Sequence, residues 1–138
     1  MNENSNHETY LFISEKKYII SVNKEFNQKK ADSILSLLTY KDSLYAQTSH
    51  SISFYFYKKE KKYDLAIKYG EIETHVLEKL NLNNKAYANA LYNLGKFHFK
   101  KGDYNNSIKY YKKAIKSNAS PLKTAQSYCG IGRCYRIK

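Results

Sequence analysis

Histidine is the residue type in this chain best suited to act as a general base or to hold a metal ion, and it occurs at His7, His50, His75 and His98. A catalytic histidine needs a Ser, Cys or carboxylate partner at the spacing that a motif requires, and none of the four has one. His75 and Glu78 share one face of an expected helix, but the second histidine of a zinc pair is missing. Gly130 and Gly132 lie inside a helical pattern and form no phosphate-binding loop. The sequence therefore predicts a protein that is not an enzyme, with no catalytic residue, no bound metal and no cofactor.

The two cysteines, Cys129 and Cys134, are five residues apart on one expected helix, a spacing too rigid for them to bridge each other. They also lack the paired Cys-x-x-Cys spacing of a metal site. We expect reduced thiols that pack between helices in a cytoplasmic protein. The chain has no run of about 18 apolar residues that could span a membrane, and its first residues lack the basic and apolar regions of a signal peptide.

Positive charge is concentrated in the last third of the chain. The net charge is +12; residues 1–83 hold 12 Lys against 11 acidic residues, whereas residues 84–138 hold 10 Lys and two Arg against Asp103 alone. Such a field attracts an acidic partner and also nucleic acid without sequence preference. The alternative is an ordinary solvated helix face, formed by Lys109, Lys112, Lys113 and Lys116.

The elements that position these residues are expected to be helices. Pro121 is the only proline and only five glycines occur, so long helices are not interrupted and no β-hairpin pattern is present. We expect an all-α single domain at 7–138 after a polar leader at 1–6. About seven helices are expected, near residues 8–26, 28–39, 41–59, 63–80, 85–100, 104–117 and 121–137.

A helix, a tight turn and a second helix are predicted most clearly between residues 88 and 121. Gly95 leaves room for a partner helix to approach closely, and Gly102-Asp103 combines a residue suited to a left-handed turn with a helix cap. The second helix has a buried stripe at helical spacing, formed by Ser107, Ile108, Tyr111, Ala114 and Ile115. This pattern resembles the tetratricopeptide repeat (TPR). The resemblance implies antiparallel helix pairs stacked as a right-handed solenoid.

Degenerate copies of the repeat are expected on both sides of it. Residues 122–138 form a partial repeat in which Gly132 lies 37 residues after Gly95, and degenerate repeats precede residue 84, with Phe54 at the glycine position. The last helix would lack a partner on one face, at Ile131, Cys134 and Tyr135. Three explanations remain open at this stage: a terminal cap, a fragment of a longer array, or a homo-oligomer that forms through the C-terminal helix.

The TPR resemblance implies that the first helix of each pair lines a concave groove. The family's groove positions fall here on Asn89, Tyr92, Asn93, Lys96, Phe99 and Lys100, and the next repeat adds Arg133. Asparagine amides can pair with an extended peptide backbone, and lysines can bind a carboxylate. We therefore expect a peptide-binding scaffold for an extended, acidic peptide or protein segment. The alternative for Asn89 and Asn93 is that they are solvent-facing residues in an Asn-rich chain.

Two further interpretations concern the kind of partner. The irregular repeat spacings of 37 and 41 residues, from about residue 40 onward, resemble the helical domains of bacterial peptide-sensing regulators of the Rap, PlcR and NprR type. That resemblance implies a short peptide ligand and a regulatory output. The alternative is a basic, nucleic-acid-associated protein in which lysines bind phosphates and tyrosines such as Tyr128 and Tyr135 stack on bases, with affinity that falls steeply with salt.

Overall fold

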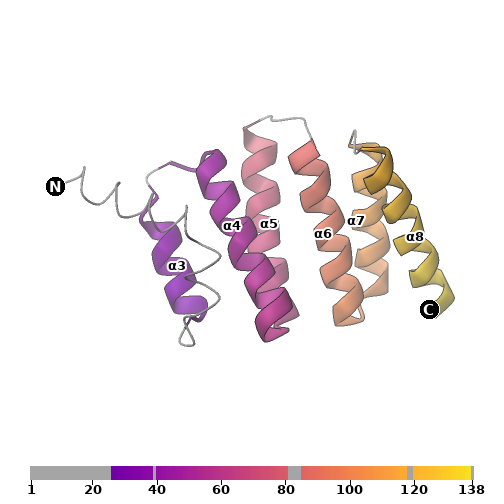
Figure 1. Cartoon of the computed structure of the whole chain (residues 1–138), viewed down its shortest axis with the longest axis horizontal. Helices are drawn as coiled ribbons and strands as arrows, with labels where there is room; N and C mark the ends of the chain where they lie inside the picture. Colours follow the sequence, from indigo (N-terminus) through magenta and orange to yellow (C-terminus); the bar gives the residue numbers. More distant parts are fainter. Residues whose placement is uncertain (1–25, 39, 81–84, 118–119, 138) are drawn as a thin grey trace.

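The computed structural model of the chain describes residues 26–38, 40–80, 85–117 and 120–137. These residues form helices and no strand, and the helices stand side by side in chain order (Figure 1). They are α3 (Gln28–Ser36), α4 (Ser43–Tyr55), the π-helical turn η1 (Phe56–Glu60), α5 (Tyr63–Lys79), α6 (Lys85–Lys101), α7 (Tyr104–Lys116) and α8 (Pro121–Ile137). The all-α expectation is confirmed. The helix expected at 8–26 lies outside the described residues except for Phe26.

Neighbouring helices pack as successive pairs, as in a TPR-like solenoid. Helix α4 packs against α5, α6 packs against both α5 and α7, and α8 packs against α7 and also contacts α6. Helices α5 and α7 are drawn fainter, behind α4, α6 and α8 (Figure 1). The first helices of the successive pairs therefore share one side of the molecule. No helix in the described part of the chain has both the length and the apolar character to cross a lipid bilayer.

The turn between α6 and α7 has the predicted geometry. Gly102 adopts a left-handed conformation with φ of 91°, which glycine tolerates without steric cost. The Asp103 carboxylate accepts a hydrogen bond of 3.3 Å from the backbone N–H of Asn106 and so caps α7. The next backbone hydrogen bond, from Asp103 N–H to the carbonyl of His98, measures 2.9 Å. The chain is thereby reversed within two residues.

The Tyr111 ring holds the last three helices together. A Cβ atom built on Gly95 of α6 would lie 2.7 Å from this ring, and one built on Gly130 of α8 would lie 2.5 Å from it. Both glycines are therefore required for the ring to fit between the helices. The close approach of α6 and α7 also allows the Ser107 hydroxyl to donate a 2.7 Å hydrogen bond to the Gly95 carbonyl. The predicted role of Gly95 is confirmed, and Gly130 has the same role.

Three expectations about α8 need correction or completion. Cys134 does not lie on an unpartnered face: it is fully buried, with Sγ 3.4 Å from the Ser107 hydroxyl. Ile131 packs on the same core cluster as Tyr111 and so faces α7. Tyr135 is exposed as expected. Cys129 is exposed and is not a packing thiol, although both cysteines are free as predicted. The sequence period placed these residues on a helix but did not show on which side α7 lies.

The helix expected at 41–59 changes its winding before it ends. Helix α4 stops at Tyr55, and the wider turn η1 continues to Glu60, followed by Lys61 with φ of 51°. The wider turn accommodates Phe56, which is fully buried with its ring stacked on Tyr69 at 5.8 Å between centroids. A π-helical turn differs from an α-helix in the spacing of its backbone hydrogen bonds and requires no particular residue types. The periodicity of the sequence therefore does not reveal it.

His98 has the packing role that the sequence predicted. Its ring is stacked on Tyr110 with 5.3 Å between centroids, and its Nδ1 lies 3.4 Å from the Asp103 carboxylate. Burial lowers the pKa of His98 below its ordinary value, while the negative charges of Asp103 and Glu71 act in the opposite direction and Lys101 adds to the lowering. Neutral His98 is therefore the form that the folded protein favours.

This preference for neutral His98 predicts that the folded protein loses stability as the pH is lowered. Unfolded His98 binds a proton more readily than folded His98, so its contribution to the free energy of unfolding falls as the pH decreases through about 6.5. The variant His98→Phe retains the ring against Tyr110 but cannot titrate. We expect its free energy of unfolding, measured by urea denaturation, to fall less than that of the wild type between about pH 7.5 and pH 5.5. Equal losses in the two proteins would contradict this prediction.

Candidate functional site

Lys96 lies at the centre of an aromatic group contributed by two helix pairs. Its ammonium nitrogen is 5.7 Å from the ring centroid of Phe54, 5.5 Å from that of Tyr57 and 5.7 Å from that of Tyr92. Phe54 belongs to α4, Tyr57 to η1, and Tyr92 to α6 one turn before Lys96. Aromatic ring faces carry partial negative charge, which stabilises a nearby ammonium group. The three rings therefore hold a cation at a half-buried position between helix pairs.

Other cations extend this arrangement from α4 to α8. Lys58 lies over Phe54 at 5.8 Å, and Lys123 of α8 lies over Tyr92 at 4.4 Å. Arg133, also from α8, lies over Phe99 at 5.7 Å. We call this region the cationic aromatic surface; it consists of Phe54, Tyr57, Lys58, Tyr92, Lys96, Phe99, Lys100, Lys123 and Arg133.

The positive charges of this surface repel one another. Burial lowers the pKa of Lys96, and Lys123, Lys58, Lys100 and Arg133 lower it further, in that order. In the part of the chain that the structure describes, none of these five cations forms an ion pair with a carboxylate. An anion bound here would therefore stabilise the charged form of Lys96 and relieve the repulsion.

The structure brings together five of the seven residues that the sequence assigned to the groove. Tyr92, Lys96, Phe99, Lys100 and Arg133 all belong to the cationic aromatic surface.

The two asparagines have different environments. Asn93 is only 8% exposed, and its amide forms no hydrogen bond with any other described residue. Asn89 is partly exposed. Their assignment to ligand binding stays a prediction.

The pair α6 and α7 also has a counterpart among known families. Residues 88–120 match the family model described as tetratricopeptide repeat. This segment is similar to a TPR. No curated protein matches the chain. TPR domains bind protein partners, so the match supports a protein-interaction scaffold.

Sequence reasoning missed Lys123 as a member of the surface. The TPR resemblance that assigned Arg133 of α8 to the groove also implies groove positions at Gln126 and Arg136, and Lys123 lies one helical turn before Gln126 on the same face. The side-chain oxygen of Gln126 is itself buried and accepts no hydrogen bond from any residue that the structure describes. The feature of the sequence that could have identified Lys123 is its spacing of three residues from Gln126, which places the two side chains on one helix face. Phe54 was expected only as the residue at the glycine position of a degenerate repeat. Its nearness to Lys96, like that of Tyr57, depends on how two TPR-like pairs stack.

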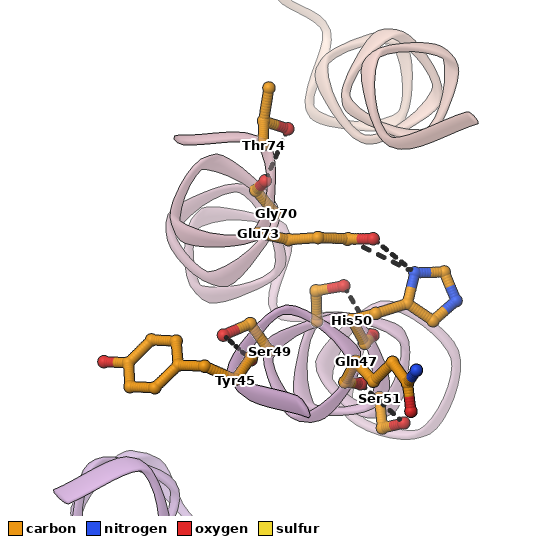
Figure 2. Close-up of polar contacts among 9 residues, drawn as sticks. Tyr45, Gln47, Ser49, His50, Ser51, Gly70, Glu73 and Thr74 are labelled. Carbon is orange, nitrogen blue, oxygen red and sulfur yellow. Dashed lines mark hydrogen bonds and ion pairs between the residues drawn. The ribbon is translucent and has the colours of Figure 1, made fainter. Parts of the chain in front are cut away.

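A His–Glu pair fixes α4 against α5 beside this surface. His50 Nδ1 lies 3.2 and 3.1 Å from the two carboxylate oxygens of Glu73. The dashed lines between the two side chains in Figure 2 mark these contacts. The Glu73 side chain is largely buried, and the His50 ring lies 4.8 Å from that of Phe54. The hydroxyls of Ser49 and Ser51 bond to carbonyls within their own helix (Figure 2). The His50–Glu73 contact therefore links the two helices and supports Phe54 at the edge of the surface.

Proposed function

We propose that the cationic aromatic surface binds an extended, acidic segment of a partner protein or peptide. The observation that carries this proposal is Lys96, a half-buried ammonium group that lies among three aromatic rings and four other cations and forms no ion pair with a described residue. A carboxylate is the group that best complements it, because a charge-assisted contact replaces repulsion by attraction.

The rest of the surface favours a peptide over an isolated anion. The rings of Phe54, Tyr57 and Phe99 offer partly exposed apolar contacts between the charges. The amide of Asn93, which forms no hydrogen bond with another described residue, has both a donor and an acceptor for a peptide backbone. An extended strand with alternating acidic and apolar side chains presents both kinds of group along its length.

A regulatory, peptide-sensing role is the finer form of this proposal. It rests on the resemblance to bacterial peptide-sensing regulators, and the chemistry of the surface suits a short acidic peptide as well as the tail of a larger protein. Binding to an acidic segment is common to both forms, so it is the property to test first.

Replacing Lys96 by methionine is expected to weaken binding of a short labelled peptide of alternating Glu and Leu residues. A lost charge-assisted contact of about 1.5–3 kcal/mol corresponds to a dissociation constant roughly ten- to a hundredfold higher. The same variant is expected to unfold at a higher urea concentration than the wild type, because it removes a half-buried charge that four cations repel. Fluorescence anisotropy and urea denaturation measure the two effects.

The matched control is Lys112→Met, which removes the same charge from an exposed position on α7. It should bind the peptide almost as tightly as the wild type. Asn93→Ala should weaken binding without unfolding the protein. Equal affinity of the wild type and Lys96→Met would contradict the proposal.

The nucleic-acid alternative has its own result in the same assay. A labelled single-stranded oligonucleotide that binds Lys96→Met and Lys112→Met equally, and loses roughly a thousandfold in affinity between about 50 mM and 200 mM salt, would show that the basic charge as a whole acts on phosphates. In that case the peptide should bind weakly or not at all.

A further inference from the structure

The surroundings of the Lys96 amine favour its neutral form. Burial and the four neighbouring cations of the surface lower its pKa, and among the described residues no carboxylate pairs with it. The facing rings counteract part of this shift, because they attract an ammonium group. At neutral pH the Lys96 amine is therefore unprotonated more often than that of a solvated lysine. Only an unprotonated amine can act as a nucleophile.

Lys101 shows the opposite situation on the same helix. Its Nζ atom lies 2.7 Å from a carboxylate oxygen of Asp64, and the hydrogen bond and charge of this carboxylate raise its pKa. Lys101 is also exposed, whereas Lys96 is partly covered. The two lysines of α6 therefore differ in the protonation state that their surroundings stabilise, although both are close to the same end of the helix.

Neighbouring cations are placed to hold an anionic reagent beside Lys96. Lys58 and Lys96 lie over the same ring, that of Phe54, and Lys123 and Lys96 lie over the same ring, that of Tyr92. The two neighbouring lysines come from η1 and α8, so cations from two other elements surround the α6 amine. Such a group of cations raises the local concentration of small anions. Acyl phosphates are acyl donors of this kind, since their leaving group is a phosphate anion.

Conversion of Lys96 to an amide would also relieve strain within the surface. An acylated lysine is neutral, so the repulsion by the four cations disappears. The added acyl group is apolar at its methyl end and can pack on the partly exposed rings of Phe54 and Tyr57. The product is therefore better accommodated at this position than the buried ammonium group.

We propose that Lys96 is an acylation site for small acyl phosphates, and that its acylation prevents binding of the acidic segment. The ammonium group first loses a proton to solvent. The neutral nitrogen then attacks the acyl carbon, the new N–C bond forms, and the C–O bond to phosphate breaks. Inorganic phosphate leaves with the bonding electron pair, and the second proton lost by the nitrogen passes to phosphate or solvent. The effect on binding rests on the proposed function, whereas the acylation itself does not.

The first test incubates the full chain with acetyl phosphate and follows each lysine by peptide mass spectrometry. We expect Lys96 to be acetylated at least about threefold faster than the exposed Lys112 of α7. Lys123→Met should slow the reaction at Lys96, because it removes a cation that lowers the Lys96 pKa and attracts the donor. The same variant should leave the rate at Lys112 unchanged, and urea denaturation verifies that it is folded.

The second test measures how acetylation changes binding of the peptide of alternating Glu and Leu residues. The acetylated wild type should bind it as weakly as Lys96→Met, with a dissociation constant roughly ten- to a hundredfold above that of the untreated protein. Lys96→Met given the same treatment should lose little further affinity. Saturating peptide should in turn protect Lys96 from acetylation and leave Lys112 unprotected.

The outcomes separate the two parts of the proposal. Equal rates at Lys96 and Lys112, or a Lys96 rate that Lys123→Met leaves unchanged, would overturn the acylation site. Unaltered peptide binding after acetylation of Lys96 would overturn its effect on binding. Preferential acetylation of Lys96 in a protein that does not bind the peptide at all would confirm the site and reject the proposed function.

Discussion

Gly95→Leu is expected to lower the free energy of unfolding by about 1–3 kcal/mol. A Cβ atom alone would already lie 2.7 Å from Tyr111, and the ring cannot retreat because Gly130 confines its other edge. Leucine therefore forces α6 and α7 apart or drives Tyr111 out of its rotamer, although leucine has a higher helix propensity than glycine. Urea denaturation followed by circular dichroism measures the loss.

The corresponding glycine of α8 provides the matched control. Gly132→Leu makes the same chemical change where no atom lies within 4 Å of the added Cβ. The higher helix propensity of leucine therefore acts there without a steric clash. We expect the two variants to shift the urea midpoint in opposite directions. A Gly95→Leu protein as stable as the wild type would show that α6 and α7 are not as closely packed as described.

Tyr111→Ala is expected to have the largest effect, about 3–5 kcal/mol, by analogy with other large aromatic residues truncated in a core. The ring is 2% exposed and packs against Tyr92 at 5.6 Å between centroids. Its loss leaves a cavity where α6, α7 and α8 meet. Urea denaturation again measures the change, with Tyr128→Ala on the exposed face of α8 as a control that should change stability little.

A double variant tests the mechanism directly. In Gly95→Leu/Tyr111→Ala the leucine side chain can enter the space that the ring vacates, so the combined loss should be smaller than the sum of the two single losses. Simple additivity would mean that the two residues do not share the contact.

The sequence determined the local features of the best repeat. Gly102 and Asp103 form the expected turn, and Gly95 admits the expected close contact, because each depends on a residue type with few conformational or steric alternatives. The grouping of Lys96 with Phe99, Lys100 and Arg133 was implied by the TPR resemblance, whose groove positions fall on these residues.

Features that depend on how helices stack could not be read in the same way. Cys134 was expected to lack a partner and proved fully buried, because a period of 3.6 residues defines a face without naming its neighbour. Lys123 and Phe54 join the cationic aromatic surface only once α8 and α4 are placed beside α6. The widened turn η1 leaves no trace in residue type.

The Tyr111 ring, held between Gly95 and Gly130, also determines the order in which the helices separate when the protein unfolds. Repeat proteins commonly unzip from their ends, since each terminal helix contacts only one neighbour. Here α6 and α8 both close on one side chain of α7, so α8 cannot separate without exposing the core of the inner pair. We therefore expect the three helices to unfold as one cooperative unit, with the backbone amides of α8 protected from hydrogen exchange to the same degree as those of α6.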